Sequence, residues 1–202
     1  MKITSIQVQV KNPNRYSVFV EGTYAFSLSA GALLESKLVN GQELTEADIR
    51  GFKKLSAEDK AFNLALAYVA RRMRSVGELH DYFKRKDYAP ELAEQILFKL
   101  KKLGFVDDME FARRWVENRR LLQATSIKKL RLELRQKKVE NDIIQNVLEE
   151  DETDERLVLR GLVEKKRKLT KYRDDPQKLM RYLASQGFSY DDIKSVLADI
   201  TE

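Results

Sequence analysis

An internal repeat constrains the fold of this chain more than any other feature of its sequence. Three segments of equal length, residues 75–100, 126–151 and 175–200, align with one another without a gap. Two columns of this alignment hold leucine in every copy: Leu79, Leu130 and Leu179 in the first, and Leu97, Leu148 and Leu197 in the second. A self-similar period of about 50 residues is typical of repeat proteins, in which each unit packs against the next.

Each copy of the repeat has the pattern of two amphipathic helices joined by a short turn. Apolar columns recur at spacings of three and four, which places them on one face of a helix. Residues that cap helix N-termini stand before the first helix of every copy. They are Ser75 with Glu78 in the first copy, Ser126 in the second, and Asp175 with Pro176 in the third.

One further helical segment precedes each pair, at residues 60–73, 107–120 and 154–168. The repeating unit is therefore a group of three helices. The sequence predicts a mainly α fold: three tandem three-helix repeats that form an elongated, curved array. Such an array presents one long face, which suits it to lie along a partner rather than to enclose a small molecule.

The first part of the chain differs, because its apolar residues alternate with polar ones. ITSIQVQV, RYSVFV and TYAFSLS have the period of two that is typical of strands, and KNPN and Glu21-Gly22 separate them as turn signals. They predict a small N-terminal antiparallel β-sheet element, supported by short helices near residues 32–38 and 46–54. The expected domains are residues 1–55, 56–106, 107–152 and 153–202.

Several classes of chemistry find no support in the sequence. The chain has no cysteine and a single histidine, so thiol catalysis and zinc–thiolate sites are excluded and a metal site is not expected. His80 lies beside the apolar stripe and is expected at the surface. Asp107 and Asp108 resemble a paired carboxylate, but the capping of a helix that begins there is the better interpretation. We expect no cofactor and a binding protein rather than an enzyme.

The net charge of +6 is unevenly distributed. Residues 113–138 hold ten basic and two acidic side chains, whereas residues 140–154 hold seven acidic side chains and no basic one. The segment SIKKLRLELRQKKV, residues 126–139, has a net charge of +5, and the same positions of the first and third copies have 0 and +1. The fold of the repeat therefore does not require this charge, which favours a role in binding polyanions or a partner.

The candidate contact residues are basic side chains beside the apolar stripe of the second repeat. They are Arg119, Arg120, Lys128, Arg131, Arg135 and Lys138. A second basic run supplies secondary candidates, Lys165, Lys166, Arg167 and Lys168, for which a solvated helix end is an equally good interpretation. Trp115 stands at helical spacing from Phe111 and Leu122, which favours a place in the core over a platform for nucleic-acid bases.

These features together resemble the RecX family of bacterial regulatory proteins, over about residues 57–202. The family's R-x-x-S-x-x-EL motif and its second, Asp-Asp-containing motif are matched by Arg72, Ser75, Glu78 and Leu79, and by Asp107, Asp108, Phe111 and Ala112, with Arg119 after them. The N-terminal sheet is similar to an extension that some members carry. The chain departs from the family at Ala124-Thr125 and Lys138, where members often have glycine, and these departures concern turns.

The resemblance implies a modulator of RecA, with functions in DNA repair, recombination and the SOS response. Such a protein binds the RecA filament on single-stranded DNA and restrains its extension, ATP hydrolysis, strand exchange and coprotease activity. It is expected to be a cytoplasmic monomer without membrane contact that binds free single-stranded DNA weakly. The alternatives are a direct, sequence-nonspecific DNA- or RNA-binding protein and a generic helical scaffold.

Overall fold

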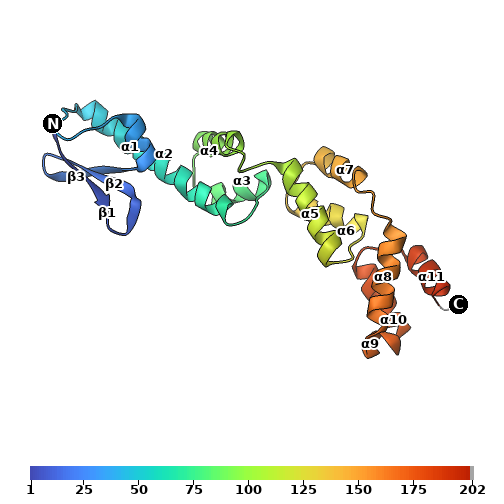
Figure 1. Cartoon of the computed structure of the whole chain (residues 1–202). Coiled ribbons are helices and arrows are strands. Elements are labelled where there is room, and N and C mark those ends of the chain that lie inside the picture. Colours follow the sequence, from blue (N-terminus) through green and yellow to red (C-terminus); the bar gives the residue numbers. More distant parts are fainter. Residues whose placement is uncertain (201–202) are drawn as a thin grey trace. The chain divides into compact units, whose positions relative to one another are not determined.

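The computed structural model describes residues 1–200, which contain three strands and eleven helices (Figure 1). The strands are β1 (Ile3–Gln9), β2 (Asn12–Val20) and β3 (Thr23–Ser29). The helices are α1 (Ala30–Ser36), α2 (Glu46–Ala70), α3 (Val76–Arg85), α4 (Pro90–Lys102), α5 (Asp108–Leu122), α6 (Ile127–Gln136), α7 (Asn141–Glu149), α8 (Glu155–Arg167), α9 (Thr170–Arg173), α10 (Pro176–Ser185) and α11 (Tyr190–Asp199). The predicted mainly α fold with a small N-terminal sheet is confirmed.

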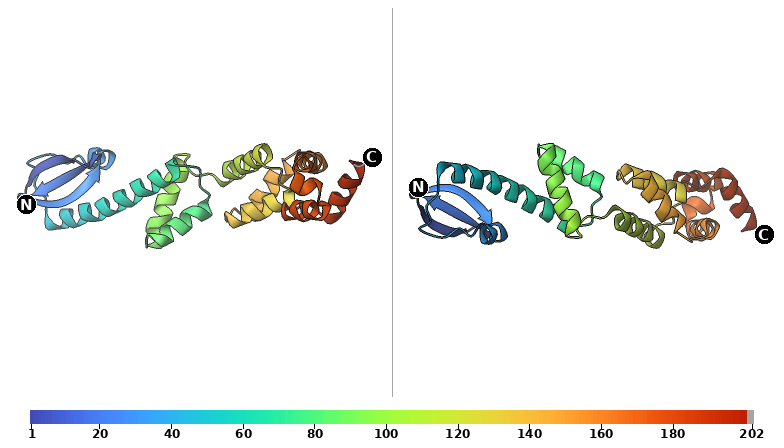
Figure 2. Two further views of the ribbon diagram at one scale, coloured as in Figure 1. Left: turned by 90° about the horizontal axis from the view of Figure 1, so that it is seen from below. Right: turned by 90° about the horizontal axis from the view of Figure 1, so that it is seen from above.

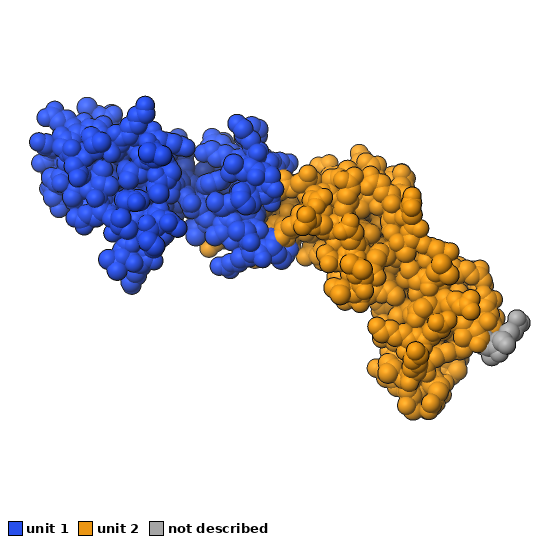
Figure 3. All heavy atoms as spheres, viewed as in Figure 1, with its two compact units in different colours: residues 1–72, 88–105 blue, residues 73–87, 106–202 orange. Residues whose placement is uncertain are grey.

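The chain folds as two compact units, which Figure 3 shows in different colours. One comprises Met1–Arg72 with Tyr88–Phe105, and the other comprises Met73–Asp87 with Val106–Glu202. Helix α3 therefore belongs to the same unit as the second and third repeats. No helix in the described part of the chain is both long and apolar enough to cross a membrane.

The sheet of the first unit has the strand order β1-β2-β3, and both pairs of strands are antiparallel. Alternate residues point to opposite faces of a strand, and the apolar set of these strands faces inward. The core around the sheet consists of buried apolar side chains from the three strands and the loop that follows α1: Ile3, Val18, Val20, Phe26, Leu28, Leu38 and Leu44. The three predicted strands are confirmed.

Helix α2 is continuous, so the short helix predicted near residues 46–54 and most of the helical segment predicted at residues 60–73 belong to one helix. Ser56 and Asp59 lie between these two segments, and their side chains are held by the sheet. Arg15 of β2 forms an ion pair with Asp59, with 2.9 Å between Nη1 and Oδ2, and also donates to the carbonyl of Ser56. The carboxylate of Asp59 accepts three further hydrogen bonds, from the backbone N–H and the hydroxyl of Ser29 and from the side-chain amide of Asn63. Tertiary contacts thus stabilise helix where the local sequence is ambiguous.

The two halves of α2 have different neighbours within the first unit (Figures 1 and 2). The N-terminal half lies beside β3, and the C-terminal half packs against α4. There Lys99 of α4 places its ammonium group 5.7 Å from the ring centre of Phe62. The predicted domain boundary at residues 55 and 56 lies inside this helix.

The second and third repeats each have their own apolar core in the second unit. Buried residues of α5, α6 and α7 form the first of these cores: Phe111, Ala112, Val116, Leu130, Leu134, Val139, Ile144, Val147 and Leu148. Residues of α8 to α11 form the other: Leu159, Leu162, Val163, Tyr172, Leu179, Leu183, Phe188, Ile193 and Val196. The repeated leucine columns of these copies lie in the cores, with Leu197 only partly buried.

Equivalent hydrogen bonds join the helix pairs of the first and second repeats to the leading helix of the repeat that follows. The backbone N–H of Val76, the first residue of α3, donates to Oδ1 of Asp108 at 2.8 Å. The N–H of Ile127, the first residue of α6, donates to Oε1 of Glu155 at 3.0 Å. Asp108 and Glu155 are the first residues of α5 and α8. Each acid therefore satisfies an N–H group that a helix N-terminus leaves without an intrahelical partner.

The backbones of consecutive repeats also approach one another closely at these junctions. The hydroxyl of Ser75 donates to the carbonyl of Lys137 at 2.5 Å, and the N–H of Ser126 donates to the carbonyl of Gln186 at 3.3 Å. A Cβ atom on Gly77 would lie 2.3 Å from Cβ of Lys138. Glycine is required at this position because any side chain would overlap the neighbouring repeat.

Candidate interaction surface

Helix α6 carries the basic segment that the sequence analysis singled out. Its N-cap is Ser126, whose hydroxyl accepts the N–H of Lys129, and this confirms the predicted start of the helix. Leu130 and Leu134 are fully buried, so the apolar stripe faces the core as predicted. The six candidate cations around this helix divide into two groups of three, according to whether a carboxylate of the chain pairs with them.

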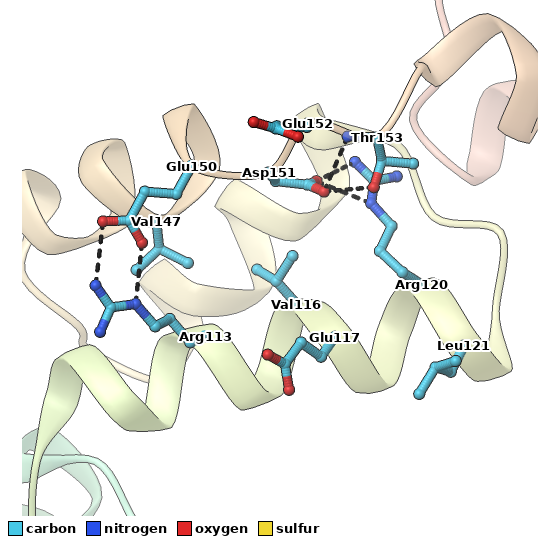
Figure 4. Close-up of a pocket in the computed structure, with 10 residues that line it drawn as sticks. All are labelled: Arg113, Val116, Glu117, Arg120, Leu121, Val147, Glu150, Asp151, Glu152 and Thr153. Carbon is cyan, nitrogen blue, oxygen red and sulfur yellow. Dashed lines mark hydrogen bonds and ion pairs between the residues drawn. The ribbon is translucent and has the colours of Figure 1, made fainter.

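Arg120 belongs to the paired group, and it holds the end of α5 against the connection between α7 and α8 (Figure 4). Its guanidinium group donates twice to Oδ2 of Asp151, at 2.9 and 2.6 Å, and once to the carbonyl of Thr125 at 2.6 Å. The side chain is only 11% exposed. The geometry assigns Arg120 a structural role, since its donors already have partners within the chain.

The carboxylate that Arg120 contacts has a perturbed pKa. Burial acts to raise the pKa of Asp151, but hydrogen bonds from Thr153 and Arg120 outweigh burial, and the pKa lies below its usual value of 3.8. Figure 4 shows a second pair in the same pocket, in which Arg113 binds Glu150 through two nitrogen atoms at 2.9 and 3.1 Å. The Arg113 pair is exposed and lowers the pKa of Glu150.

Arg119 is paired as well, in a cluster with the tryptophan of α5. Its Nε donates to Oε2 of Glu133 at 2.7 Å, and the indole N–H of Trp115 donates to the same oxygen at 2.9 Å. The guanidinium carbon of Arg119 lies 4.7 Å from the Trp115 ring centre, and the ammonium group of Lys137 lies 5.1 Å from it. These cations are within the distance for favourable cation–π contact.

Trp115 packs against the core of the second repeat and stacks on Phe111 at 5.8 Å between ring centres, as the sequence predicted. The predicted contribution of Leu122 to this core is wrong, because its side chain is exposed. Leu122 is the last residue of α5, where the chain leaves the core, so helical spacing no longer determines what it contacts.

Lys138 is the third paired cation, and it binds Asp81 of α3. The hydrogen bond from Lys138 lowers the pKa of Asp81. Lys138 has a φ of 58°, in the left-handed region, directly after the C-cap of α6. This is the backbone conformation that glycine commonly provides at a helix end. The turn is therefore formed by a lysine, at a position where the resemblance led us to expect glycine.

The other three candidates, Lys128, Arg131 and Arg135, form no ion pair with any carboxylate of residues 1–200. They lie on one face of α6, at spacings of three and four, and we call them the α6 basic face. Lys128 and Arg135 are exposed, Arg131 is partly exposed, and Arg135 donates to Oδ1 of Asn141 at 3.1 Å. Leu132 lies among them with 55% of its side chain exposed.

The secondary candidates lie at the C-terminal end of α8. Lys165, Lys166 and Arg167 occupy the last turn of the helix, and Lys168 is its C-cap. The ammonium group of Lys166 lies 4.7 Å from the ring centre of Tyr182. Cations are favourable at this end of a helix because the helix dipole is negative there. Fold stability therefore explains part of this basic run.

The motif residues build the fold of the repeats. Ser75 and Glu78 form the predicted capping box of α3, and Leu79 is fully buried. Asp107 caps α5 as predicted, by accepting the N–H groups of Met109 and Glu110. Phe111 and Ala112 are buried in the core, and Arg72 is exposed after the end of α2. His80 is exposed, in agreement with the sequence analysis.

Four family models match the chain, and together they cover most of it. They describe the regulatory protein RecX N-terminal domain at residues 1–45, and the first, second and third three-helix domains of RecX at residues 61–100, 107–148 and 154–197. The match at residues 1–45 extends the similarity to the N-terminal sheet.

Named relatives and solved structures give the same result. The regulatory protein RecX of Listeria innocua is 30% identical over 100% of this chain and 76% of its own length. That of Bacillus subtilis is 32% identical over 98% of this chain and 76% of its own length. A crystal structure of a regulatory protein RecX superposes with a TM-score of 0.75 at 26% identity, and covers 98% of both chains. The crystal structure of RecX from Lactobacillus salivarius has a TM-score of 0.60 at 25% identity, and covers 71% of this chain and 96% of that one.

Proposed function

The chain belongs to the RecX family of regulatory proteins, and we propose that it regulates RecA by binding the RecA filament on single-stranded DNA. The family is named for regulation and indicates no catalytic activity. In this proposal the protein makes and breaks no bond. It occupies the filament and restrains extension, ATP hydrolysis, strand exchange and coprotease activity. A RecA partner implies that the protein acts in the cytoplasm.

The observation that carries this proposal is the α6 basic face. Its positions correspond to Gln177, Met180 and Ala184 in the third repeat, which has the same helix pair without these cations. The fold therefore does not need Lys128, Arg131 and Arg135, and their lack of carboxylate partners leaves them available to an external anion. A nucleoprotein filament offers phosphates and acidic side chains, and both bind arginine through paired hydrogen bonds.

The proposal is tested by measuring DNA-stimulated ATP hydrolysis by RecA while this protein is added. We expect hydrolysis to fall as the protein approaches stoichiometric amounts. If hydrolysis is unchanged at and above stoichiometry, the generic scaffold becomes the better account and the proposal fails.

Charge reversal on α6 tests which surface is responsible. The double variant Arg131→Glu/Arg135→Glu should inhibit hydrolysis far less than the wild type, because it replaces two cations of the α6 basic face with acids. Its helical content and melting temperature should be preserved, because both side chains lie outside the buried leucine stripe. The matched control, Lys11→Glu/Lys53→Glu, makes the same change in net charge on exposed residues of the first compact unit and should inhibit like the wild type. Equal inhibition by the α6 variant would show that its cations do not contribute.

Direct, sequence-nonspecific binding of nucleic acid is the second candidate, and the same three cations favour it. Three phosphate contacts on a single strand give a slope of about −2 for the logarithm of the affinity against the logarithm of the salt concentration. The filament proposal expects binding to bare single-stranded DNA to be much weaker than binding to the filament. Equal affinity for both would favour the second candidate.

A further inference from the structure

A groove of about 630 Å³ lies in the second compact unit, and no residue of the α6 basic face lines it. The end of α5 and the loop that follows it form one side, α8 forms the other, and Tyr182 of α10 and the C-cap of that helix, Gln186, complete the lining. Figure 1 gives the positions of these helices. The volume is within the range of about 300–1,000 Å³ that is typical of ligand sites.

Three leucines that line this groove are largely exposed to solvent. Leu121 is 82% exposed, Leu122 is 77% exposed and Leu157 is 65% exposed. Single exposed leucines need no explanation, but a group of them around one groove marks a surface that a partner covers. The helix pattern of α5 and α8 does not require leucine here, since neither repeat core includes these side chains.

The charge of the groove is positive. Its charged lining residues are Arg120, Lys165 and Lys166, and none of its lining residues, all within the described chain, is acidic. Arg120 is neutralised by Asp151, whereas Lys165 and Lys166 form no ion pair with a carboxylate of residues 1–200. Lys165 and Lys166 can therefore pair with the carboxylates of an acidic partner without first breaking an ion pair within the chain.

Gly161 lines the groove and lies in the middle of α8, where no contact within the described chain requires a glycine. Glycine is the least favourable residue after proline in a helix interior. A Cβ atom at this position would meet nothing within 4 Å, so packing within the chain does not exclude a side chain. A bare backbone in the lining of a groove permits the close approach of another chain.

We propose that this groove binds a short acidic peptide segment of a partner protein, with leucine-like side chains against Leu121, Leu122 and Leu157 and carboxylates at Lys165 and Lys166. A nucleic acid fits less well, because leucines offer nothing to a phosphate. The ring of Tyr182 is also already flanked, by the Lys166 ammonium at 4.7 Å and by the Tyr172 ring at 5.3 Å. The proposal does not depend on RecA as the partner.

The test is a selection from a library of random displayed peptides, about twelve residues long, with the full chain as the bait. The pool is counter-selected against the Gly161→Leu variant, whose added side chain fills the groove from an open, exposed position. We expect enriched peptides that combine acidic residues with leucine, isoleucine or phenylalanine. Enrichment of peptides without acidic residues would overturn the proposal, and so would the failure of any peptide to distinguish the wild type from Gly161→Leu.

The affinity of an enriched, fluorescently labelled peptide is then measured with variants and a control. Lys165→Glu/Lys166→Glu and Gly161→Leu should each weaken binding by about tenfold or more, as is usual for the loss of a central contact. The control Lys171→Glu/Lys194→Glu removes two lysines of the third repeat that also lie over tyrosines, outside the groove, and should bind like the wild type. Melting curves of all variants verify folding. Labelled single-stranded DNA that binds with the same dependence on Gly161, in place of the peptide, would assign the groove to nucleic acid and refute the proposal.

Discussion

Replacement of Gly77 by alanine should destabilise the junction between the first two repeats, although alanine is the better helix former. The added Cβ would lie 2.3 Å from Cβ of Lys138 and 3.1 and 3.2 Å from the carbonyl oxygens of Lys138 and Lys137. None of these atoms can rotate away, because two are backbone atoms and the third is bonded directly to the backbone. The carbonyl of Lys137 also accepts the hydroxyl of Ser75, so separation of the backbones strains this hydrogen bond too.

The magnitude follows from two opposing effects. Alanine in place of glycine stabilises a helix interior by up to about 1 kcal/mol, and this value is an upper limit for Gly77, which is the second residue of α3. Carbon atoms in contact prefer about 3.5–4.0 Å, so the two Cβ atoms must separate by more than about 1 Å. Overpacking of this kind costs about 1–3 kcal/mol, and the strained hydrogen bond adds about 1 kcal/mol. We therefore expect a net loss of about 1–3 kcal/mol, which lowers the melting temperature by roughly 2–10 °C.

Thermal unfolding followed by circular dichroism measures the global effect, and amide hydrogen exchange at Val76 and Leu79 locates it. Gly161→Ala is the matched control, because it also replaces a helical glycine but its Cβ meets nothing within 4 Å. It should raise stability by about 0.5–1 kcal/mol. If Gly77→Ala is as stable as the wild type, or changes in the same direction as Gly161→Ala, the close contact between the repeats is refuted.

Two further predictions concern buried ion pairs. The pKa of Asp151 is lowered in the folded state, so its ionised carboxylate stabilises the fold above the usual pKa of 3.8, and this stabilisation is lost as the pH falls through the folded pKa. Asp151→Asn should therefore be less stable than the wild type at neutral pH and should lose less stability in acid. Urea unfolding at several pH values measures both effects. Equal pH dependence of both proteins would contradict this assignment. Arg15→Met should lower the free energy of unfolding by about 3 kcal/mol, because it leaves the carboxylate of Asp59 buried without its cation. The double variant Arg15→Met/Asp59→Asn should recover part of that loss in the same assay. A double variant less stable than the single one would refute the reasoning.

The features that could be predicted from the sequence are those set by local patterns. The leucine columns, the capping residues and the strand alternation depend on neighbours within a few positions, and the structure confirms them at Leu130, Ser75 and Asp107. The continuity of α2 could not be predicted, because it depends on the contact between Arg15 and Asp59, which are far apart in the chain.

The candidate surface was predicted only in part, for the same reason. The sequence singled out six of the ten cations in residues 113–138, but which of the six are paired depends on Asp81, Glu133 and Asp151, which come from three separate places in the chain. One signal for the junctions was present: Asp108 and Glu155 occupy the same place in consecutive repeats. It could be found by comparison of the leading helices position by position.

The most direct test of the proposed function is co-sedimentation with RecA filaments assembled on single-stranded DNA. Bare single-stranded DNA and RecA without DNA serve as the comparisons. We predict that the wild type and Lys11→Glu/Lys53→Glu sediment with the filament and associate weakly with bare DNA. The affinity of Arg131→Glu/Arg135→Glu for the filament should fall by about tenfold or more. Equal binding of all three proteins to the filament, or binding to bare DNA as tight as to the filament, would contradict the account.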